Sequence, residues 1–186
     1  MAVYAVTVVG IDQPGNLAAV AGALVEQGCH IDDSEMAILR GHSAMMLVVS
    51  PNTEAGAESL EEALAKAVVD RGLNVTVHPI DPGVSRDIRE GEPWTVAVHG
   101  ANRPGILYEV TRILARANVN IVGVNTRVHE EAARPQYTMA IQVTVPPSVD
   151  GNDVAAQLDK VGGELNLACS MRPAPPAPEA ALRQSP

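Results

Sequence analysis

The chain has 186 residues and a formal net charge of -9, because 22 acidic residues outnumber 13 basic ones. Nucleic-acid binding depends largely on Lys and Arg neutralising phosphates, so this balance argues against direct binding to DNA or RNA. The chain has one Trp, three Tyr and no Phe, which also removes the stacking surfaces of single-strand binders. The length allows one domain or two small ones.

Apolar runs stay short of the roughly 20 residues needed to cross a bilayer, and the first residues lack the basic start of a secretory signal. We therefore expect a soluble, cytosolic protein without membrane contact. The two cysteines, Cys29 and Cys169, are too few for a disulfide framework or for a zinc site of their own. No cofactor is expected.

An internal repeat organises the chain. Residues 6–31 align without a gap with residues 96–121, and 9 of the 26 positions are identical. Shared composition, at about 7% for a common residue, would give roughly two identities. Further along, Ser50-Pro51 aligns with Val145-Pro146, so the shift grows from 90 to 95. The second copy should therefore carry about five extra residues, which we place in a longer hairpin loop at 130–135.

In the first copy, β-branched residues predict a strand over 3–9 that ends at Gly10. Apolar residues then recur at helical spacing up to Val25, which predicts a helix. Gly28 follows it, at a place suited to the left-handed backbone of a helix C-terminus. The remaining predicted elements are two strands, a helix and a strand, at 34–39, 44–49, 57–71 and 74–79.

The second copy has the same order. A strand over 94–98 ends at Gly100, and a helix follows, with Asn118 at the place that Gly28 occupies in the first copy. The remaining predicted elements are again two strands, a helix and a strand, at 121–128, 137–145, 151–161 and 165–171.

The order β-α-β-β-α-β, found twice, predicts two units of the α+β, ferredoxin-like class. In each unit, two helices should cover one face of a four-stranded antiparallel sheet. We expect unit boundaries at 1–80 and 94–172, a linker over 81–93 and a disordered, Pro/Ala-rich tail over 173–186. The first unit holds 3 basic and 10 acidic residues and the second holds 7 of each, so the negative charge belongs mainly to the first unit.

A short motif stands twice between the first strand and the first helix. Its residues are Asp12-Gln13-Pro14-Gly15 in the first copy and Asn102-Arg103-Pro104-Gly105, followed by Ile106, in the second. Pro fixes φ in a tight turn, and the following Gly can take the positive φ of a type II turn. The turn leads into a helix whose first N–H groups lack internal partners, so the loop can hold a carboxylate. The alternative is a turn that only changes the chain direction.

Polar residues near this loop suggest a ligand. Asp12 and Asn102 can each cap the following helix or contact a ligand, and capping is the simpler interpretation. Asn120, at the start of the next strand, is expected to face back toward the loop, and His30 is its equivalent in the first copy. Asn102 and Asn120 together with the loop N–H groups would suit an α-amino acid. Asp12 makes the first copy less suited to a carboxylate.

These motifs resemble those of the ACT-domain family of small-molecule regulatory modules. The stretch 28–39 is similar, in addition, to the family of glycine cleavage system transcriptional repressors, which have two ACT units and about this length. The resemblance implies units paired edge to edge or through helices in a homodimer, with an amino acid of the glycine or serine class between them. It also implies action through a DNA-binding transcription factor as protein partner. In serine-binding members, the contacts fall on Gly100, where the family has His, and on Asn102 and Asn120.

Two other functions remain open. A protein-docking module without a ligand is one, since the acidic first unit could meet a basic partner. A metal-dependent enzyme is the other, because acidic and His residues gather at His30, Asp32, Asp33, Glu35 and His42. The sequence contains no His-x-x-x-His motif, no Cys-x-x-Cys motif and no nucleophile elbow, so we expect a protein that is not an enzyme.

Overall fold

The structure, a computed structural model, describes residues 2–52, 56–81, 90–130 and 135–174. The chain divides into two compact units, Met1–Ser85 and Arg86–Pro186. Most of the expected linker and tail lies outside the described residues. Among those that are described, no helix has both the length and the apolar character that crossing a bilayer requires.

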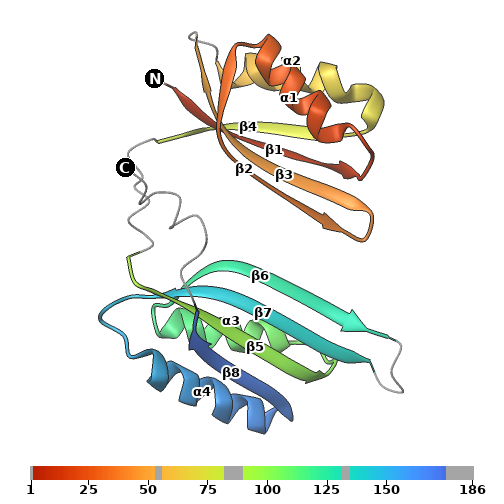
Figure 1. Ribbon diagram of the computed structural model, residues 1–186. Coiled ribbons are helices and arrows are strands. Elements are labelled where there is room, and N and C mark those ends of the chain that lie inside the picture. The colour runs from red at the N-terminus through yellow and green to blue at the C-terminus, as the bar shows by residue number, and fades with distance from the viewer. Residues whose placement is uncertain (1, 53–55, 82–89, 131–134, 175–186) are drawn as a thin grey trace. The chain divides into compact units, whose positions relative to one another are not determined.

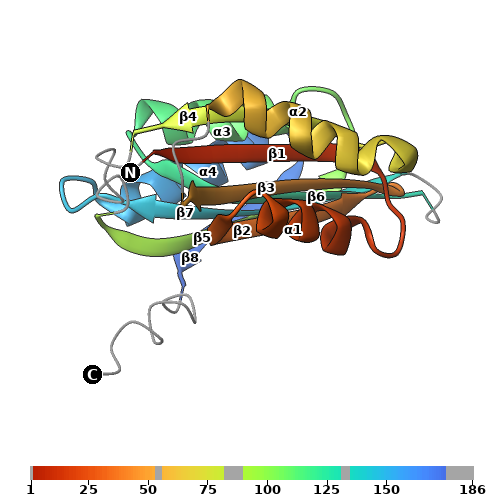
Figure 2. The same ribbon diagram turned by 90° about the horizontal axis from the view of Figure 1, so that it is seen from above.

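Unit 1 has two helices on one face of an antiparallel sheet of strand order β2-β3-β1-β4, with α1 and α2 packed against each other (Figures 1 and 2). Its elements are β1 (Val3–Ile11), α1 (Asn16–Glu26), β2 (Cys29–Leu39), β3 (His42–Pro51), α2 (Ala57–Val68), the 3-10 turn η1 (Val69–Arg71) and β4 (Asn74–Ile80).

Unit 2 repeats this arrangement, with strand order β6-β7-β5-β8 and with α3 and α4 on one face of the sheet (Figure 1). Its elements are β5 (Glu92–Ala101), α3 (Ile106–Arg116), β6 (Asn120–His129), β7 (Gln136–Val145), α4 (Gly151–Glu164) and β8 (Leu167–Pro173). The predicted fold class, two βαββαβ units of the ferredoxin-like type, is thus confirmed.

Each unit has its own aliphatic core between its sheet and its helices. Alternate residues of the central strands point toward the helices, as Val6 and Val8 do in β1 and Val96 and Val98 do in β5. The helices supply residues at helical spacing that are fully buried in both units: Val20, Leu24, Leu60 and Leu64 in unit 1, and Val110, Leu114, Val154 and Leu158 in unit 2.

The prediction that Gly10 and Gly100 end the first strands is wrong, because β1 and β5 each run one residue further. Both glycines are required because the neighbouring chain leaves no room for a Cβ atom. A Cβ on Gly10 would lie 2.6 Å from Leu73 Cδ2, and a Cβ on Gly100 would lie 2.5 Å from Leu167 Cδ2. The backbone of the central strand therefore passes too close to the last strand of its unit for any larger residue.

The longer hairpin loop of the second copy is confirmed in place but not in size. Strand pairing leaves two residues, 40 and 41, between β2 and β3, and six residues, 130–135, between β6 and β7. Val49 and Val143 hold equivalent places, opposite Ile31 and Ile121, so the shift is 94 rather than 95. The insertion therefore has four residues.

The predicted left-handed residues after the first helix of each copy are confirmed, with φ of 65° at Gly28 and 56° at Asn118. Asn tolerates this backbone because its short side chain can hydrogen-bond locally. Both units thus use the same helix end to lead into their edge strand.

Candidate functional site

The Pro-Gly turn lies before the first helix in both units. Gly15 and Gly105 occupy the N-cap positions of α1 and α3 with φ of 88° and 91°, so the predicted positive φ is confirmed. The first helical bonds run from Ala19 N to Gly15 O at 2.9 Å and from Glu109 N to Gly105 O at 3.0 Å. No side chain caps either helix, and the N–H groups before these bonds can face an anion.

The capping interpretation of Asp12 and Asn102 is wrong, since neither side chain bonds to a helix N-terminus. Their backbones tie the loop to the neighbouring hairpin instead. Asp12 N donates to Gly41 O at 2.8 Å, and Asn102 N donates to Pro135 O at 2.9 Å. Both side chains are therefore free to act on something other than the helix.

Unit 1 fills the space around its loop with its own polar groups. Asn16 is 1% exposed, and its Nδ2 donates to Ile11 O at 2.9 Å. Arg71 Nη1 donates to Pro14 O at 3.3 Å and to Asn16 Oδ1 at 3.4 Å. No local motif in the sequence predicts this arrangement, because Asn16 and Arg71 are 55 residues apart.

Unit 2 has apolar residues at the same two places. The repeat sets Ile106 at the position of Asn16, and Ile106 is 2% exposed. Gly10 faces Leu73 and Gly100 faces Leu167, so Leu73 and Leu167 hold equivalent places. Arg71 and Leu165 each come two residues earlier and are therefore equivalent as well. Leu165 packs against the core of unit 2. No cationic side chain therefore holds the Asn102 loop from this side.

Asn120 does not face back toward the Asn102 loop, so that expectation is wrong within one unit. Asn120 pairs with Thr144, at the end of the sheet where β5 begins, whereas Asn102 follows the last residue of β5. Thr144 pairs in turn with Pro93 of β5, and Asn102 comes nine residues after Pro93. At 3.3 Å per residue, Asn120 and Asn102 are therefore about 30 Å apart along the sheet. Asp12 and His30 lie at opposite ends of unit 1 in the same way, because His30 pairs with Ser50.

Two family profiles match the chain, one in each unit. A profile described as ACT domain matches residues 4–78, and a second one, also described as ACT domain, matches residues 94–163. The chain belongs to the ACT-domain family. It contains two ACT units in tandem, and the expected resemblance is confirmed.

Curated relatives of this tandem ACT chain are longer proteins. Phosphoserine phosphatase SerB2 of Mycobacterium tuberculosis is 29% identical over 166 residues, which cover 87% of the chain and 38% of the phosphatase. A bifunctional uridylyltransferase/uridylyl-removing enzyme of Bradyrhizobium sp. (strain ORS 278) is 27% identical over 153 residues, 70% of the chain and 16% of the enzyme. The chain therefore spans well under half the length of these relatives.

Two solved structures share the whole tandem fold. A protein of unknown function from Galdieria sulphuraria has a TM-score of 0.77 at 26% identity, over 94% of this chain and 99% of that one. A protein provisionally described as a glycine cleavage system transcriptional repressor has a TM-score of 0.72 at 18% identity, over 92% and 96%. At 18% identity the second likeness concerns the fold alone.

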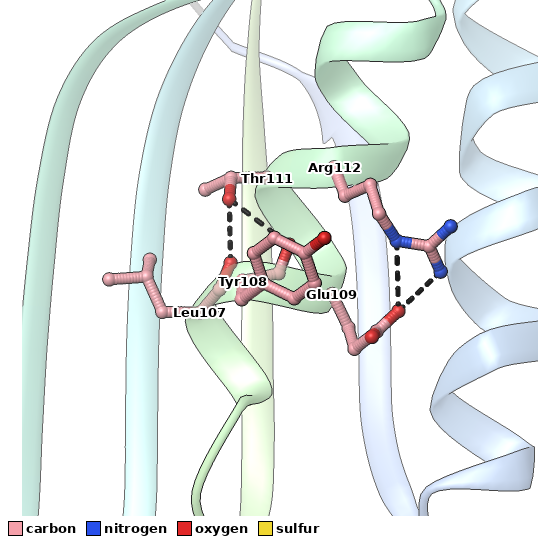
Figure 3. A network of polar contacts seen from close by, with 5 residues as sticks. All are labelled: Leu107, Tyr108, Glu109, Thr111 and Arg112. Carbon is pink, nitrogen blue, oxygen red and sulfur yellow. Dashed lines mark hydrogen bonds and ion pairs between the residues drawn. The ribbon is translucent and has the colours of Figure 1, made fainter.

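The first helix of the second ACT unit is braced by polar contacts (Figure 3). Thr111 Oγ1 donates to Leu107 O at 2.9 Å and to Tyr108 O at 3.2 Å. Arg112 forms an ion pair with Glu109 one turn away, and this carboxylate raises the pKa of the Arg112 guanidinium. The Glu109–Arg112 ion pair lies on the turn of α3 that follows the Asn102 loop.

The acidic and His residues of the first ACT unit do not gather into a metal site. Among the described residues, no group of three or more His, Cys, Asp or Glu side chains could hold an ion. A register shift between Ile31 and Asp33 leaves Asp32 outside the pairing of β2 and β3. Cys29 and Cys169 are buried as free thiols, and burial raises the pKa of both.

One edge strand of each ACT unit, β2 in unit 1 and β6 in unit 2, is long and exposed. β6 has 10 residues and β2 has 11, and each stands at the end of its strand order with one side unpaired within its unit. The larger apolar residues on this edge of unit 2 are Val122, Val124 and Val128, which are 45%, 48% and 38% exposed, and Leu107 on the neighbouring helix is 43% exposed. Such an edge can accept another strand.

Proposed function

We propose that this tandem ACT protein binds an amino acid and regulates other proteins by contact, without catalytic activity of its own. The observation that carries the proposal is the uncapped N-terminus of α3 behind the Gly105 turn, with the Asn102 side chain free of helix capping beside it. Backbone N–H groups at a helix start suit a carboxylate. The amide oxygen of Asn102 can then accept from the ammonium group of the same ligand.

The two expected Asn contacts belong to one site only if two ACT units combine. Within one unit the strand β6 keeps Asn120 and the Asn102 loop about 30 Å apart. An antiparallel pair of β6 strands, with its two-fold axis between Val124 and Asn125, sets Asn120 of one copy level with His129 of the other. His129 pairs with Gln136, which pairs with Ala101, so that level is the start of the Asn102 loop. We therefore propose a homodimer with the ligand between copies.

The second unit is the better candidate for the ligand. Its loop is neutral apart from Arg103, whereas unit 1 has Asp12, whose carboxylate would repel that of an amino acid. Asn16 and Arg71 also bind each other and the loop of unit 1. We keep Gln13, Pro14, Gly15 and His30 as the equivalent, weaker site.

Glycine or serine is the proposed ligand class. Both fit a short site between two Asn amides, and serine adds a hydroxyl group that an amide can bind.

Regulation of transcription in glycine and one-carbon metabolism is the proposed role. Support comes from the shared tandem fold with the provisionally described glycine cleavage system repressor. The charge of -9 favours an indirect route through a DNA-binding protein, since the chain has few cations to neutralise phosphates. A docking module without a ligand is the second candidate, favoured by the acidic charge of the first unit.

Complementation between variants tests the shared site. Glycine and L-serine are titrated against the full chain by calorimetry and thermal unfolding, where a ligand at 100 times its Kd stabilises by about 2.7 kcal/mol. Asn102→Ala and Asn120→Ala should each abolish binding. A mixture of the two variants, unfolded and refolded together, should regain binding, because each mixed dimer holds one intact site.

The matched controls are the unit 1 equivalents, Asp12→Ala and His30→Ala, which should leave the tighter binding component unchanged and remove only the weaker one. A double Asn102→Ala/Asn120→Ala variant should fail to complement either single variant. Absence of stabilisation by every one of the 20 amino acids would refute the ligand and leave the docking module. Loss of binding in the unit 1 variants alone would move the site to the Asp12 loop.

A further inference from the structure

The sheet of unit 2 carries a hollow on the face turned away from α3 and α4. Its volume is about 440 Å³, within the range of small-molecule sites. Strand pairing defines the hollow by rows of residues that run across the sheet. The middle row is Asn125, Ala140, Ala97 and Ser170, from β6, β7, β5 and β8 in that order. Two alanines therefore form the floor, with a polar side chain at each end.

The neighbouring row consists of Arg127, Thr138, His99 and Ala168. It contributes Thr138, His99 and Ala168 to the lining of the hollow, and Arg127 stands next to this lining at the β6 end of the row. Thr138 Oγ1 lies 3.2 Å from His129 Nε2, so it is already engaged. The side chains of His99, Asn125 and Ser170 make no hydrogen bond with the described part of the chain. Three polar side chains from three strands are thus available around one hollow.

The charge of this face differs from that of the whole chain. The third row is Gly123, Gln142, Thr95 and Arg172. Arg127 and Arg172 therefore stand at opposite corners of the three rows, outside the lining of the hollow itself. No Asp or Glu lies on this face in the three rows, although the chain as a whole has a charge of -9. A guanidinium group pairs best with a carboxylate or a phosphate.

The equivalent face of unit 1 carries residues of different size and charge. The place of Ala140 is taken there by the larger Met46, and the place of Asn125 by Glu35. Asp33 replaces Gly123, and Ala37 replaces Arg127. Unit 1 therefore has a larger residue and more acidic residues at the positions where unit 2 has small, neutral or basic ones.

We propose that this hollow is a second ligand site, separate from the Asn102 loop, for a small organic anion. Arg127 binds the carboxylate or phosphate group of the ligand, and His99, Asn125 and Ser170 bind its other polar atoms. Ala97 and Ala140 leave the space that the ligand occupies. A carboxylate and a phosphate ester both accept charge-assisted hydrogen bonds from the Arg127 guanidinium group, but the two groups differ in charge and geometry.

Calorimetry on the full chain at constant ionic strength tests the site with two charged probes, succinate and glycerol 3-phosphate. Succinamide and glycerol are their uncharged counterparts and should not bind. Ala140→Met, which copies unit 1, and Arg127→Ala should each weaken binding of the active probe at least tenfold. Arg116→Ala, which removes an exposed cation from α3, should change it less than twofold.

Binding of either charged probe with this variant pattern supports the site and identifies the anionic group. Both variants should keep the wild-type circular dichroism and the wild-type response to glycine or serine. Failure of both probes to bind overturns the proposal, as does equal weakening by Arg116→Ala or equal binding of succinamide. Because Met46 is accommodated in unit 1, Ala140→Met should fold, and Arg127→Ala provides an independent variant.

Discussion

The two ACT units build the same turn and surround it differently. Gly15 and Gly105 have nearly equal φ, and α1 and α3 both start without a side-chain cap. In unit 1 the buried Asn16 and the half-buried Arg71 bind each other and the loop. Unit 2 has Ile106 and Leu165 there. The same Pro-Gly turn is thus held by side-chain hydrogen bonds in unit 1 and lacks the equivalent side chains in unit 2.

The sheet faces turned away from the helices also differ between the two units. The register places Glu35 and Met46 of unit 1 where unit 2 has Asn125 and Ala140. Charge and volume therefore change together between the copies, while the strand order stays the same. The overall charge of -9 averages over two chemically different surfaces.

The largest expected effect tests whether the two cores are equivalent. Leu24→Ala and Leu114→Ala remove the same fully buried side chain from α1 and from α3. Each should lower the free energy of unfolding of its own unit by about 2–5 kcal/mol, from lost burial and a cavity. Hydrogen exchange with mass spectrometry reads peptides of the two units separately, and the fluorescence of Trp94, the single Trp, reports unit 2.

Each leucine variant serves as the control of the other. If Leu24→Ala raised hydrogen exchange in the peptides of unit 2 as strongly as in those of unit 1, the two units would unfold together. The comparison between separate cores would then be wrong.

A smaller effect is expected from exchanging the residues that distinguish the loops. Asn16→Ile removes the bond to Ile11 O and leaves that carbonyl without its donor, at a cost of about 1–3 kcal/mol. Ile106→Asn buries an amide without a cationic neighbour, at a similar cost. Urea unfolding of both variants gives the values.

The double variant Ile106→Asn/Leu165→Arg sharpens this test, because it gives unit 2 the Asn–Arg pair of unit 1. It should be more stable than Ile106→Asn alone. Equal stability of Ile106→Asn and the wild-type chain would show that the apolar surroundings of the second loop do not matter.

Much of the fold could be predicted because it depends on local signals. Hydrophobic periods placed the helices and strands, and the turn chemistry of Gly28, Asn118, Gly15 and Gly105 predicted four positive φ values. The ends of the strands could not be predicted in the same way. Gly10 has a role set by Leu73, which comes 63 positions later, so its neighbours in sequence suggested a strand end that does not exist.

The candidate site was harder to predict than the fold. Asn102 and Asn120 are close in sequence and similar in type, which suggested one pocket. Strand direction separates them, because β6 begins at the end of the sheet where β5 begins. The hollow over Ala140 was missed for a related reason. Its members come from four strands, and only the register between strands brings them into rows.

The smallest effect concerns the buried thiols at alkaline pH. Burial raises the pKa of Cys29, and burial followed by the negative charge of Asp159 raises the pKa of Cys169. A folded-state pKa above the unfolded value of about 8.5 means that the folded chain keeps its proton longer. The stability from these thiols is therefore fully present below that pH and is lost as the pH rises toward the folded-state pKa. Cys169→Ala should flatten this decline between pH 8 and 10 more than Cys29→Ala does, because only Cys169 has a carboxylate that adds to the shift. Urea unfolding at several pH values measures it, and the same slope in the wild-type chain and both variants would assign the decline to other groups.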